Sequence, residues 1–302
     1  YKKPLVWTNR VKRIFAVASL LSVGICVAAW FIWKSWYVVD VALLVIFAMS
    51  HAIIMLSGIL LKPVEASINR KYYNEAASIL RSMPDLTVIG VTGSYGKTST
   101  KHYLNRILSE KYDVLMTPGS YNTTMGVIRT VREMMKPYNE IFICEMGAKN
   151  IGDIKEICDL VHPTIGIVTA VGEQHLESFK TIENVQRTKF ELVDSLPENG
   201  VAVINDDFPF AASRKVDNVK ALRYAVRAVD NADYRVTSVV YDETGTSFSM
   251  QGPEGEFSFH TRLVGECNIS NLMGAVIVAL YLKVPVDKIQ YAISKIEQVE
   301  HR

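Results

Sequence analysis

The stretch that most constrains the fold runs from Thr87 to Leu104. Residues Thr87–Val91 form a short β-branched run, which predicts a buried strand. Gly93 and Gly96 then mark a tight loop, and from Lys97 onward the apolar residues recur at helical spacing. A strand, a glycine loop and a helix in this order gather backbone N–H groups and a helix N-terminus around one point. That arrangement binds phosphate groups.

The loop reads Thr-Gly-Ser-Tyr-Gly-Lys-Thr-Ser, a short form of the general phosphate-binding pattern. The general pattern has a glycine five positions before Gly96, where this chain has Val91. We expect Lys97 to reach the β and γ oxygens of a nucleotide and Thr98 to place its hydroxyl on Mg²⁺. The predicted nucleotide-binding residues are Thr92, Gly93, Ser94, Tyr95, Gly96, Lys97, Thr98 and Ser99. The alternative is a plain strand–turn–helix corner with a surface lysine, and the flanking strand and helix favour nucleotide binding.

The length of 302 residues leaves room for one large or two medium domains. A net charge of +2 gives no basic field, so we expect no nucleic-acid partner. The cysteines are scattered without metal-binding spacing and are expected to be buried thiols in a reducing compartment: Cys26, Cys144, Cys158 and Cys267. The chain begins at Tyr1 rather than Met and stops in a charged stretch, so we expect it to belong to a longer protein.

Two apolar runs dominate the N-terminal part, and residues 1–62 are predicted to form a transmembrane hairpin. The spans are expected at about 14–33 and 41–61, each long enough to cross a bilayer as a helix. A polar break from Lys34 to Asp40 separates them, with aromatic residues around it as at a membrane interface. A signal peptide and a buried helix pair are the alternatives. His51 is expected to pack between helices rather than to carry protons.

Basic residues flank the outer ends of both runs, which predicts that both termini face the cytoplasm. They are Lys2, Lys3, Arg10, Lys12 and Arg13 before the first run, and Lys62, Arg70, Lys71 and Arg81 after the second. Residues 63–85 mix charges with regularly spaced apolar residues and are predicted to be an amphipathic connecting helix.

From residue 86 to 302 short apolar runs alternate with helical patterns, which predicts an α/β domain. The alternation favours a mostly parallel sheet with helices on both faces. Strands are expected at 87–91, 114–116, 141–145, 164–169 and 201–204, and helices near 97–110, 124–136, 151–160 and 182–196. Residues 220–264 change to short alternating strands with glycine turns, which predicts a small antiparallel appendage. Two helices are expected after it, near 268–282 and 286–298.

Polar side chains follow several predicted strands directly. Glu145 ends one strand, His175 and Glu177 follow the next, and Asn205 to Asp207 follow another. In open α/β sheets the carboxyl ends of the strands meet at one edge, where ligands bind. These side chains are therefore expected near the phosphate loop.

Taken together, these elements resemble the Mur ligase family, over about residues 87–302. The most similar type adds D-alanyl-D-alanine to UDP-MurNAc-tripeptide. The matching segments occur in the family's order: Thr92–Ser99, Thr117–Gly126, Glu145–Ala148, Gly172–Glu177, Lys189 within Arg-Thr-Lys-Phe-Glu, Asn205–Asp207 and Gly265–Asn271.

The resemblance implies an ATP-dependent, ADP-forming ligase of cell-wall synthesis. In this family ATP phosphorylates a substrate carboxylate, and an amine attacks the resulting acyl phosphate. The implied partners are ATP, a carboxylate acceptor, an amine donor and a lipid bilayer. The implied location is the bacterial plasma membrane, with the ATPase domain and both termini in the cytoplasm.

The family also implies a role for individual residues. Lys97, Lys189 and His175 would be catalytic, and a first Mg²⁺ would lie on Thr98 or Ser99 and Glu145. A second Mg²⁺ would be held by His175 and by Lys189 carbamylated by CO₂, since an unmodified lysine would repel it. The remaining assignments are Asn122 and Thr123 toward the substrate, Asn205 and Asn271 by the adenine, and Arg302 near the phosphates. Each residue also has a structural alternative, such as a helix-capping Glu145, a loop histidine or a solvated lysine.

The chain departs from the family in one respect. A membrane hairpin and a connector stand where the family has a soluble domain for the UDP-sugar, so a lipid-linked or polymeric carboxylate is an alternative acceptor. The family's C-terminal domain, which binds the incoming amine, is expected after Arg302. Two other functions stay open: a different P-loop hydrolase or kinase, and a non-catalytic membrane-tethered ATP-binding module. The guanine motif Asn-Lys-x-Asp is not found, which counts against a GTPase.

Overall fold

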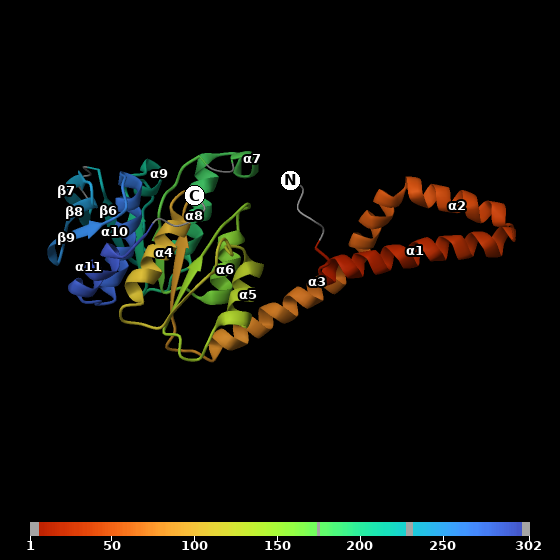
Figure 1. The fold of residues 1–302 in the computed structure, drawn as a ribbon, viewed down its shortest axis with the longest axis horizontal. Coiled ribbons are helices and arrows are strands. Elements are labelled where there is room, and N and C mark those ends of the chain that lie inside the picture. The colour runs from red at the N-terminus through yellow and green to blue at the C-terminus, as the bar shows by residue number, and fades with distance from the viewer. Residues whose placement is uncertain (1–5, 174–175, 228–231, 298–302) are drawn as a thin grey trace. The chain divides into compact units, whose positions relative to one another are not determined.

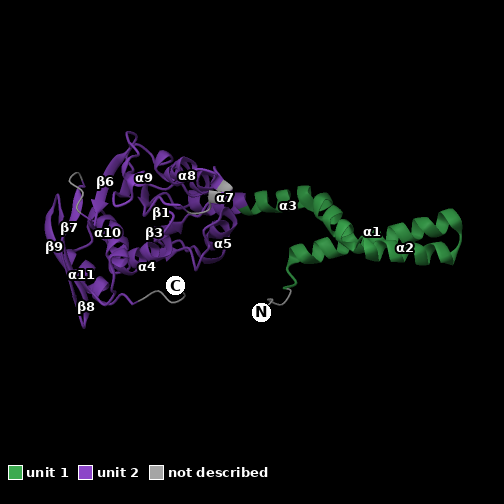
Figure 2. Cartoon of the chain, turned by 90° about the horizontal axis from the view of Figure 1, so that it is seen from above, with its two compact units in different colours: residues 1–72 green, residues 73–302 purple. Residues whose placement is uncertain are grey.

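A computed structural model of the chain describes residues 6–173, 176–227 and 232–297. The chain divides into two compact units, residues 1–72 and 73–302, which are coloured separately in Figure 2. The N-terminal unit is helical, and the C-terminal unit carries the sheet. His175 and Arg302, both predicted site residues, lie outside the described residues.

The N-terminal unit consists of α1 (Asn9–Trp33), α2 (Trp36–Ala48) and the first part of α3 (Ser50–Arg81). The predicted polar break from Lys34 to Asp40 is wrong in extent, because only Lys34 and Ser35 lie between α1 and α2. Lys34 adopts a left-handed conformation with φ 47° and donates its N–H to Trp30 O at 2.7 Å, which ends α1. The rings of Trp30 and Trp36 then pack across the turn, 4.3 Å apart.

The second apolar run is not the single helix predicted over 41–61. It bends at Met49, where α2 ends after 13 residues and α3 begins. Met49 still donates to Val45 O at 2.8 Å and accepts from Ile53 N at 3.1 Å, so the chain bends without forming a loop. No proline or glycine marks the bend, and hydropathy therefore gives no signal for it. The connecting helix predicted over 63–85 forms the last part of α3, which passes through Pro63 and continues to Arg81. A proline removes only one backbone hydrogen bond, and the helix continues on either side of it.

By length and composition, α1 and α3 are each long and apolar enough to cross a membrane. Few residues of their most apolar segments are buried within the structure. An ion pair joins the start of α1 to the middle of α3: Arg13 Nε donates to Glu65 Oε1 at 2.9 Å. The beginning of the first apolar run and the end of the second therefore lie side by side.

The C-terminal unit is built on one nine-stranded sheet in the order β2-β3-β1-β4-β5-β6-β7-β8-β9. Figure 1 labels the strands β6 to β9 of this sheet. The first six strands along the chain pair in parallel. Five of them were predicted for the parallel sheet, whereas the sixth falls in the segment 220–264 that was predicted to be antiparallel, and that part of the prediction is wrong. Their bounds are β1 Thr87–Thr92, β2 Val114–Met116, β3 Ile141–Glu145, β4 Ile165–Val168, β5 Val201–Asn205 and β6 Lys220–Ala225.

The predicted antiparallel segment exists, but it is not an appendage. β7 (Tyr234–Asp242) pairs in parallel with β6, and only β8 (Gly245–Gly252) and β9 (Gly255–Thr261) add antiparallel strands. Both hairpin turns fall where the glycines predicted them. The same sheet therefore continues, and its β6 edge is paired instead of exposed.

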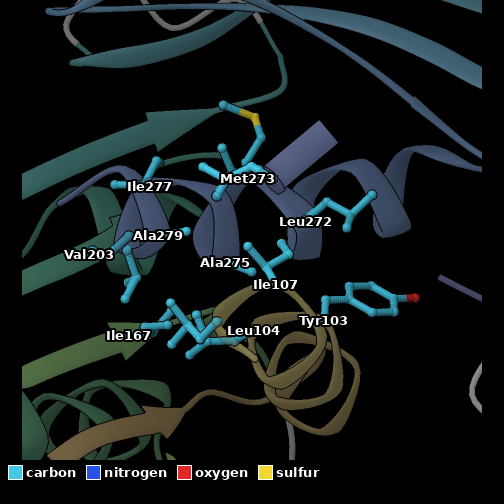
Figure 3. Close-up of a cluster of buried hydrophobic side chains, with 14 of the residues drawn as sticks. Tyr103, Leu104, Ile107, Ile167, Val203, Leu272, Met273, Ala275, Ile277 and Ala279 are labelled. Carbon is cyan, nitrogen blue, oxygen red and sulfur yellow. The ribbon is translucent and has the colours of Figure 1, made fainter. Parts of the chain in front are cut away.

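Helices cover both faces of the sheet. They are α4 Lys97–Leu108, α5 Thr124–Met134, α6 Asp153–Val161, α7 Leu176–Phe179, α8 Ile182–Asp194, α9 Pro209–Ala212, α10 Glu266–Tyr281 and α11 Val286–Ser294. Strand residues alternate between two cores, as the pleat requires. On β4, Ile167 faces the core that α4 and α10 build, whereas Val168 faces the core under α8. Figure 3 shows the labelled side chains of α4 and α10 packed together beside Ile167 and Val203. This packing fixes the first turn of α4, where the phosphate loop ends.

Candidate active site

The phosphate loop lies at the carboxyl end of β1 and leads directly into α4. Gly93 has φ 150° and Gly96 has φ 80°, conformations that side-chain-bearing residues rarely adopt. A Cβ atom on Gly93 would lie 2.2 Å from Thr169 Oγ1, and one on Gly96 would lie 2.2 Å from Asn271 Oδ1. Both glycines are therefore required by close packing as well as by backbone conformation.

Side chains of the loop fasten it to the end of the neighbouring strand β4. Ser94 Oγ donates to Gly172 O at 3.0 Å and accepts from Gly172 N at 3.1 Å. The Thr169 hydroxyl bonds to the carbonyls of Thr92 and Tyr95, at 3.1 and 2.5 Å. Thr92 and Tyr95 also donate their own hydroxyls to backbone carbonyls, of Met146 and Glu173 respectively. The loop is thus shaped in advance of any ligand.

Lys97, the first residue of α4, folds back over the loop. Its Nζ atom lies 2.5 Å from Gly93 O and 3.4 Å from Ser94 O. The ammonium group therefore sits at the helix N-terminus, where the helix dipole adds further positive potential. A phosphate group entering the loop would meet the ammonium and the first turn of α4 together.

Glu145, at the end of β3, is almost fully buried beside the first turn of α4. Its Oε1 atom accepts hydrogen bonds from Thr98 Oγ1 at 3.2 Å and from Asn122 Nδ2 at 3.1 Å. Its backbone N–H donates to Thr117 Oγ1 at 3.1 Å. Its other carboxylate oxygen, Oε2, lies 3.0 Å from Lys101 Nζ.

The donor set of Thr98 and Glu145 fits Mg²⁺. Magnesium takes hard oxygen ligands at about 2.0–2.1 Å in an octahedron, so adjacent ligand oxygens lie about 3.0 Å apart. The 3.2 Å between Thr98 Oγ1 and Glu145 Oε1 is close to that edge length. Among the described residues no group of three or more His, Cys, Asp and Glu side chains forms a metal cluster. The Thr98 hydroxyl and the Glu145 carboxylate are the ligands that we assign to a first Mg²⁺.

Lys189, on α8, is buried with 2% of its surface exposed. Burial, together with repulsion from Lys97, lowers the pKa of Lys189 to about 8. Its ammonium also lies 6.0 Å from the ring centre of Phe179. The predicted alternative of a solvated surface lysine is therefore wrong for this residue. Its carbamylation stays a prediction.

The remaining predicted residues make structural contacts around the loop. Asn205 is buried and donates to Thr169 O at 2.9 Å and Ser270 Oγ at 2.8 Å. Asn271 Oδ1 accepts from Thr100 Oγ1 at 3.3 Å. Thr123 caps α5 by accepting from Gly126 N. Their roles toward adenine and substrate stay predictions, as does a ligand role for Ser99 in the first turn of α4.

The carboxylates that follow β5 make structural contacts. Asp207 accepts hydrogen bonds from the N–H groups of Val226 and Arg227, and so fixes the loop after β6. Asp206 is paired with Arg223 at 2.7 Å.

Two residues of the site were not predicted from the sequence. Lys101 lies beside Glu145, and Thr169 holds the phosphate loop. A signal for Lys101 was present, because it stands on the same helical stripe as Leu104 and Leu108, which are buried. Thr169 gave no such signal, since a single threonine after a strand is ordinary.

The comparisons with known proteins agree with this geometry. The Mur ligase middle domain model matches residues 91–279. The UDP-N-acetylmuramoyl-tripeptide–D-alanyl-D-alanine ligase of Escherichia coli K12 is 30% identical over 235 residues, which cover 77% of this chain and 52% of that enzyme. The enzyme of the same name from Bacillus subtilis is 32% identical over 195 residues, covering 64% of this chain and 41% of its own length.

Solved structures show the same relationship. MurF of Acinetobacter baumannii superposes with a TM-score of 0.70 at 25% identity, covering 76% of this chain and 50% of that one. The MurF ligase of Thermotoga maritima, solved with ADP, superposes with a TM-score of 0.70 at 28% identity, covering 76% and 52%. The chain thus spans about half the length of the relatives that it matches. The Mur ligase match covers both the preformed phosphate loop and the Thr98–Glu145 pair. This chain therefore belongs to the Mur ligase family.

Proposed function

We propose that the protein is an ADP-forming amide ligase that activates a carboxylate with ATP. The observation that carries the proposal is the pair Thr98–Glu145, 3.2 Å apart at the end of the phosphate loop that Lys97 covers. The family membership and the ADP bound to the Thermotoga maritima relative support it.

The chain's residues would act on the charges of the reaction. A carboxylate oxygen attacks the γ-phosphorus, the bond to the β–γ bridging oxygen breaks, and ADP leaves with that oxygen. Lys97 would stabilise the negative charge that develops on this bridge, and the N-terminus of α4 would add to its effect. Thr98 and Glu145 would hold Mg²⁺, which neutralises phosphate charge when bound. The amine then attacks the acyl carbon, and phosphate departs with one oxygen of the original carboxylate.

Lys189, once carbamylated, would help to bring the substrate carboxylate and the γ-phosphate together, although both are anions. Carbamylation needs the neutral amine, and a pKa of about 8 leaves about a tenth of the lysine neutral at pH 7. The product is an anionic oxygen donor, which suits a second Mg²⁺. The same residue as a cation would only add positive charge beside Lys97.

The proposed substrates follow the names of the relatives, which join a UDP-MurNAc-tripeptide to D-alanyl-D-alanine. The shared chemistry is a muramyl-peptide carboxylate, carried either on UDP or on a lipid. The test measures ADP release by the full-length protein with D-alanyl-D-alanine and each form of acceptor. We expect release only when both substrates are present, and the acceptor form that supports it identifies the carrier. ADP release that ignores both substrates contradicts the proposal.

We also propose that the N-terminal unit anchors the protein in the plasma membrane, with the ATPase domain and both termini in the cytoplasm. The apolar surfaces of α1 and α3 are exposed, and a bilayer would cover them. The ion pair between Arg13 and Glu65 supports a hairpin, because it puts the outer ends of both apolar runs on the same side. The basic residues at these ends favour the cytoplasmic side.

A topology measurement tests this anchor. A reporter active only outside the cytoplasm is expected to be inactive when fused after Leu61 and active when inserted after Lys34. The physical reason is the distribution of Lys and Arg around the runs. The reverse pattern would overturn the orientation and the cytoplasmic use of ATP.

A further inference from the structure

A lysine that no proposed step uses lies at the centre of the site. Lys101 stands one turn after Lys97 on α4 and has no exposed surface. Lysine is almost never fully buried unless it is paired, because a buried ammonium loses its hydration. Its partners should therefore explain why it is there.

Lys101 has two partners within the site. Its Nζ atom lies 3.0 Å from Glu145 Oε2 and donates to Gly119 O at 2.6 Å. Among the described residues Oε2 accepts no aligned hydrogen bond, so the opposite charge of Lys101 is what faces it. The other oxygen, Oε1, faces Thr98 and Asn122. One oxygen of the carboxylate thus faces Lys101, and the other faces the proposed metal ligand Thr98.

The second partner belongs to the segment between β2 and α5. Gly119 adopts a left-handed conformation with φ 50° in that segment. The same segment carries Thr117, which accepts the N–H of Glu145, and Asn122, which donates to its carboxylate. Lys101 is therefore a third link between this segment and Glu145, besides Thr117 and Asn122. The same segment carries the residues predicted to face the substrate.

We propose that Lys101 is a positioning residue for the magnesium site: it keeps the Glu145 carboxylate aimed at Thr98 before the metal arrives. This inference rests on the proposed function, since it takes Glu145 and Thr98 as the metal ligands. Without Lys101, the buried carboxylate loses the ammonium that lies 3.0 Å from its Oε2 atom, and the segment with Gly119 loses the hydrogen bond that ties it to α4. The alternative role, repulsion of the metal by Lys101, predicts the opposite result. If Lys101 only repelled the metal, its removal would strengthen magnesium binding.

The test separates metal binding from nucleotide binding by calorimetric titration of ADP at varied Mg²⁺ concentrations. For Lys101→Met we expect the Mg²⁺ concentration that gives half-maximal enhancement of ADP binding to rise at least tenfold. ADP affinity in EDTA should stay within twofold, because it depends on the loop and on Lys97. The matched control is Arg106→Met, which removes an ion pair with Glu110 from the same helix and should shift neither value.

Two results would overturn the inference: an unchanged or lowered magnesium requirement, or an equal loss of ADP affinity with and without metal. The second would mean a merely structural lysine. If Lys101→Met does not fold, Lys101→Gln is measured in the same way, since it keeps a donor for Gly119 O without the charge.

Thermal unfolding of Lys101→Met, Glu145→Gln and the double variant adds a second measurement. Additive losses in Tm would contradict the pairing. A wild-type protein that binds no Mg-ADP contradicts the proposed function itself, whereas normal wild-type binding with no shift contradicts only the role of Lys101.

Discussion

Replacing Lys97 by alanine is expected to weaken Mg-ATP binding at least tenfold. The ammonium sits over the phosphate loop, 2.5 Å from Gly93 O, where the β and γ oxygens would bind. A charge-assisted hydrogen bond contributes about 1.5–3 kcal/mol, and about 1.4 kcal/mol corresponds to a factor of ten in affinity. Calorimetric titration of the variant with Mg-ATP measures the effect.

Arg106→Ala is the control for this experiment. It removes a basic side chain from the same helix, where Arg106 is paired with Glu110 away from the loop. Its ATP affinity should equal that of the wild type. An unchanged affinity in Lys97→Ala would contradict the assignment of residues 92–99 as a nucleotide site.

Replacing Lys189 by alanine is expected to abolish most ligation and to leave ATP binding within twofold. Binding depends on Lys97 and on the Thr98–Glu145 pair, whereas the carbamate would hold the carboxylate against the γ-phosphate. Product formation and ATP affinity are measured on the same full-length preparation. Added short carboxylic acids should restore part of the activity, because they can supply the missing anionic oxygen.

Arg187→Ala is the matched control, since Arg187 is exposed on the same helix α8. It should change neither binding nor turnover. Wild-type turnover in Lys189→Ala would mean that Lys189 takes no part in the reaction, and the second metal site would be wrong. Loss of ATP binding together with turnover would instead indicate a structural lysine.

Much of the α/β unit could be predicted, because its signals are local. Strand β1 and helix α4 are recognisable from a β-branched run, two glycines and apolar spacing, and the structure has them at Thr87–Thr92 and Lys97–Leu108. The hairpin turns before Gly245 and Gly255 were equally visible. Both glycines have φ values in the region that favours glycine, 139° and 128°.

Most of the features that the sequence did not predict depend on contacts between distant segments. Strand β6 extends the sheet because it pairs with β5. The periodicity of its residues does not reveal that partner. The bend at Met49 has no proline or glycine to mark it. The role of Lys101 appears only when α4, β3 and the segment with Gly119 are brought together. The phosphate loop was predictable because all of its parts lie within one short stretch.

The most direct test of the central claim follows an oxygen atom through the reaction. The acceptor carboxylate that supports ADP release is labelled with ¹⁸O and incubated with the full-length protein, Mg-ATP and D-alanyl-D-alanine. The phosphate released is then analysed by mass. An acyl phosphate route transfers one labelled oxygen from the carboxylate to each phosphate, with ADP and amide formed in equal amounts. Release of unlabelled phosphate, or of AMP and pyrophosphate, would contradict the account.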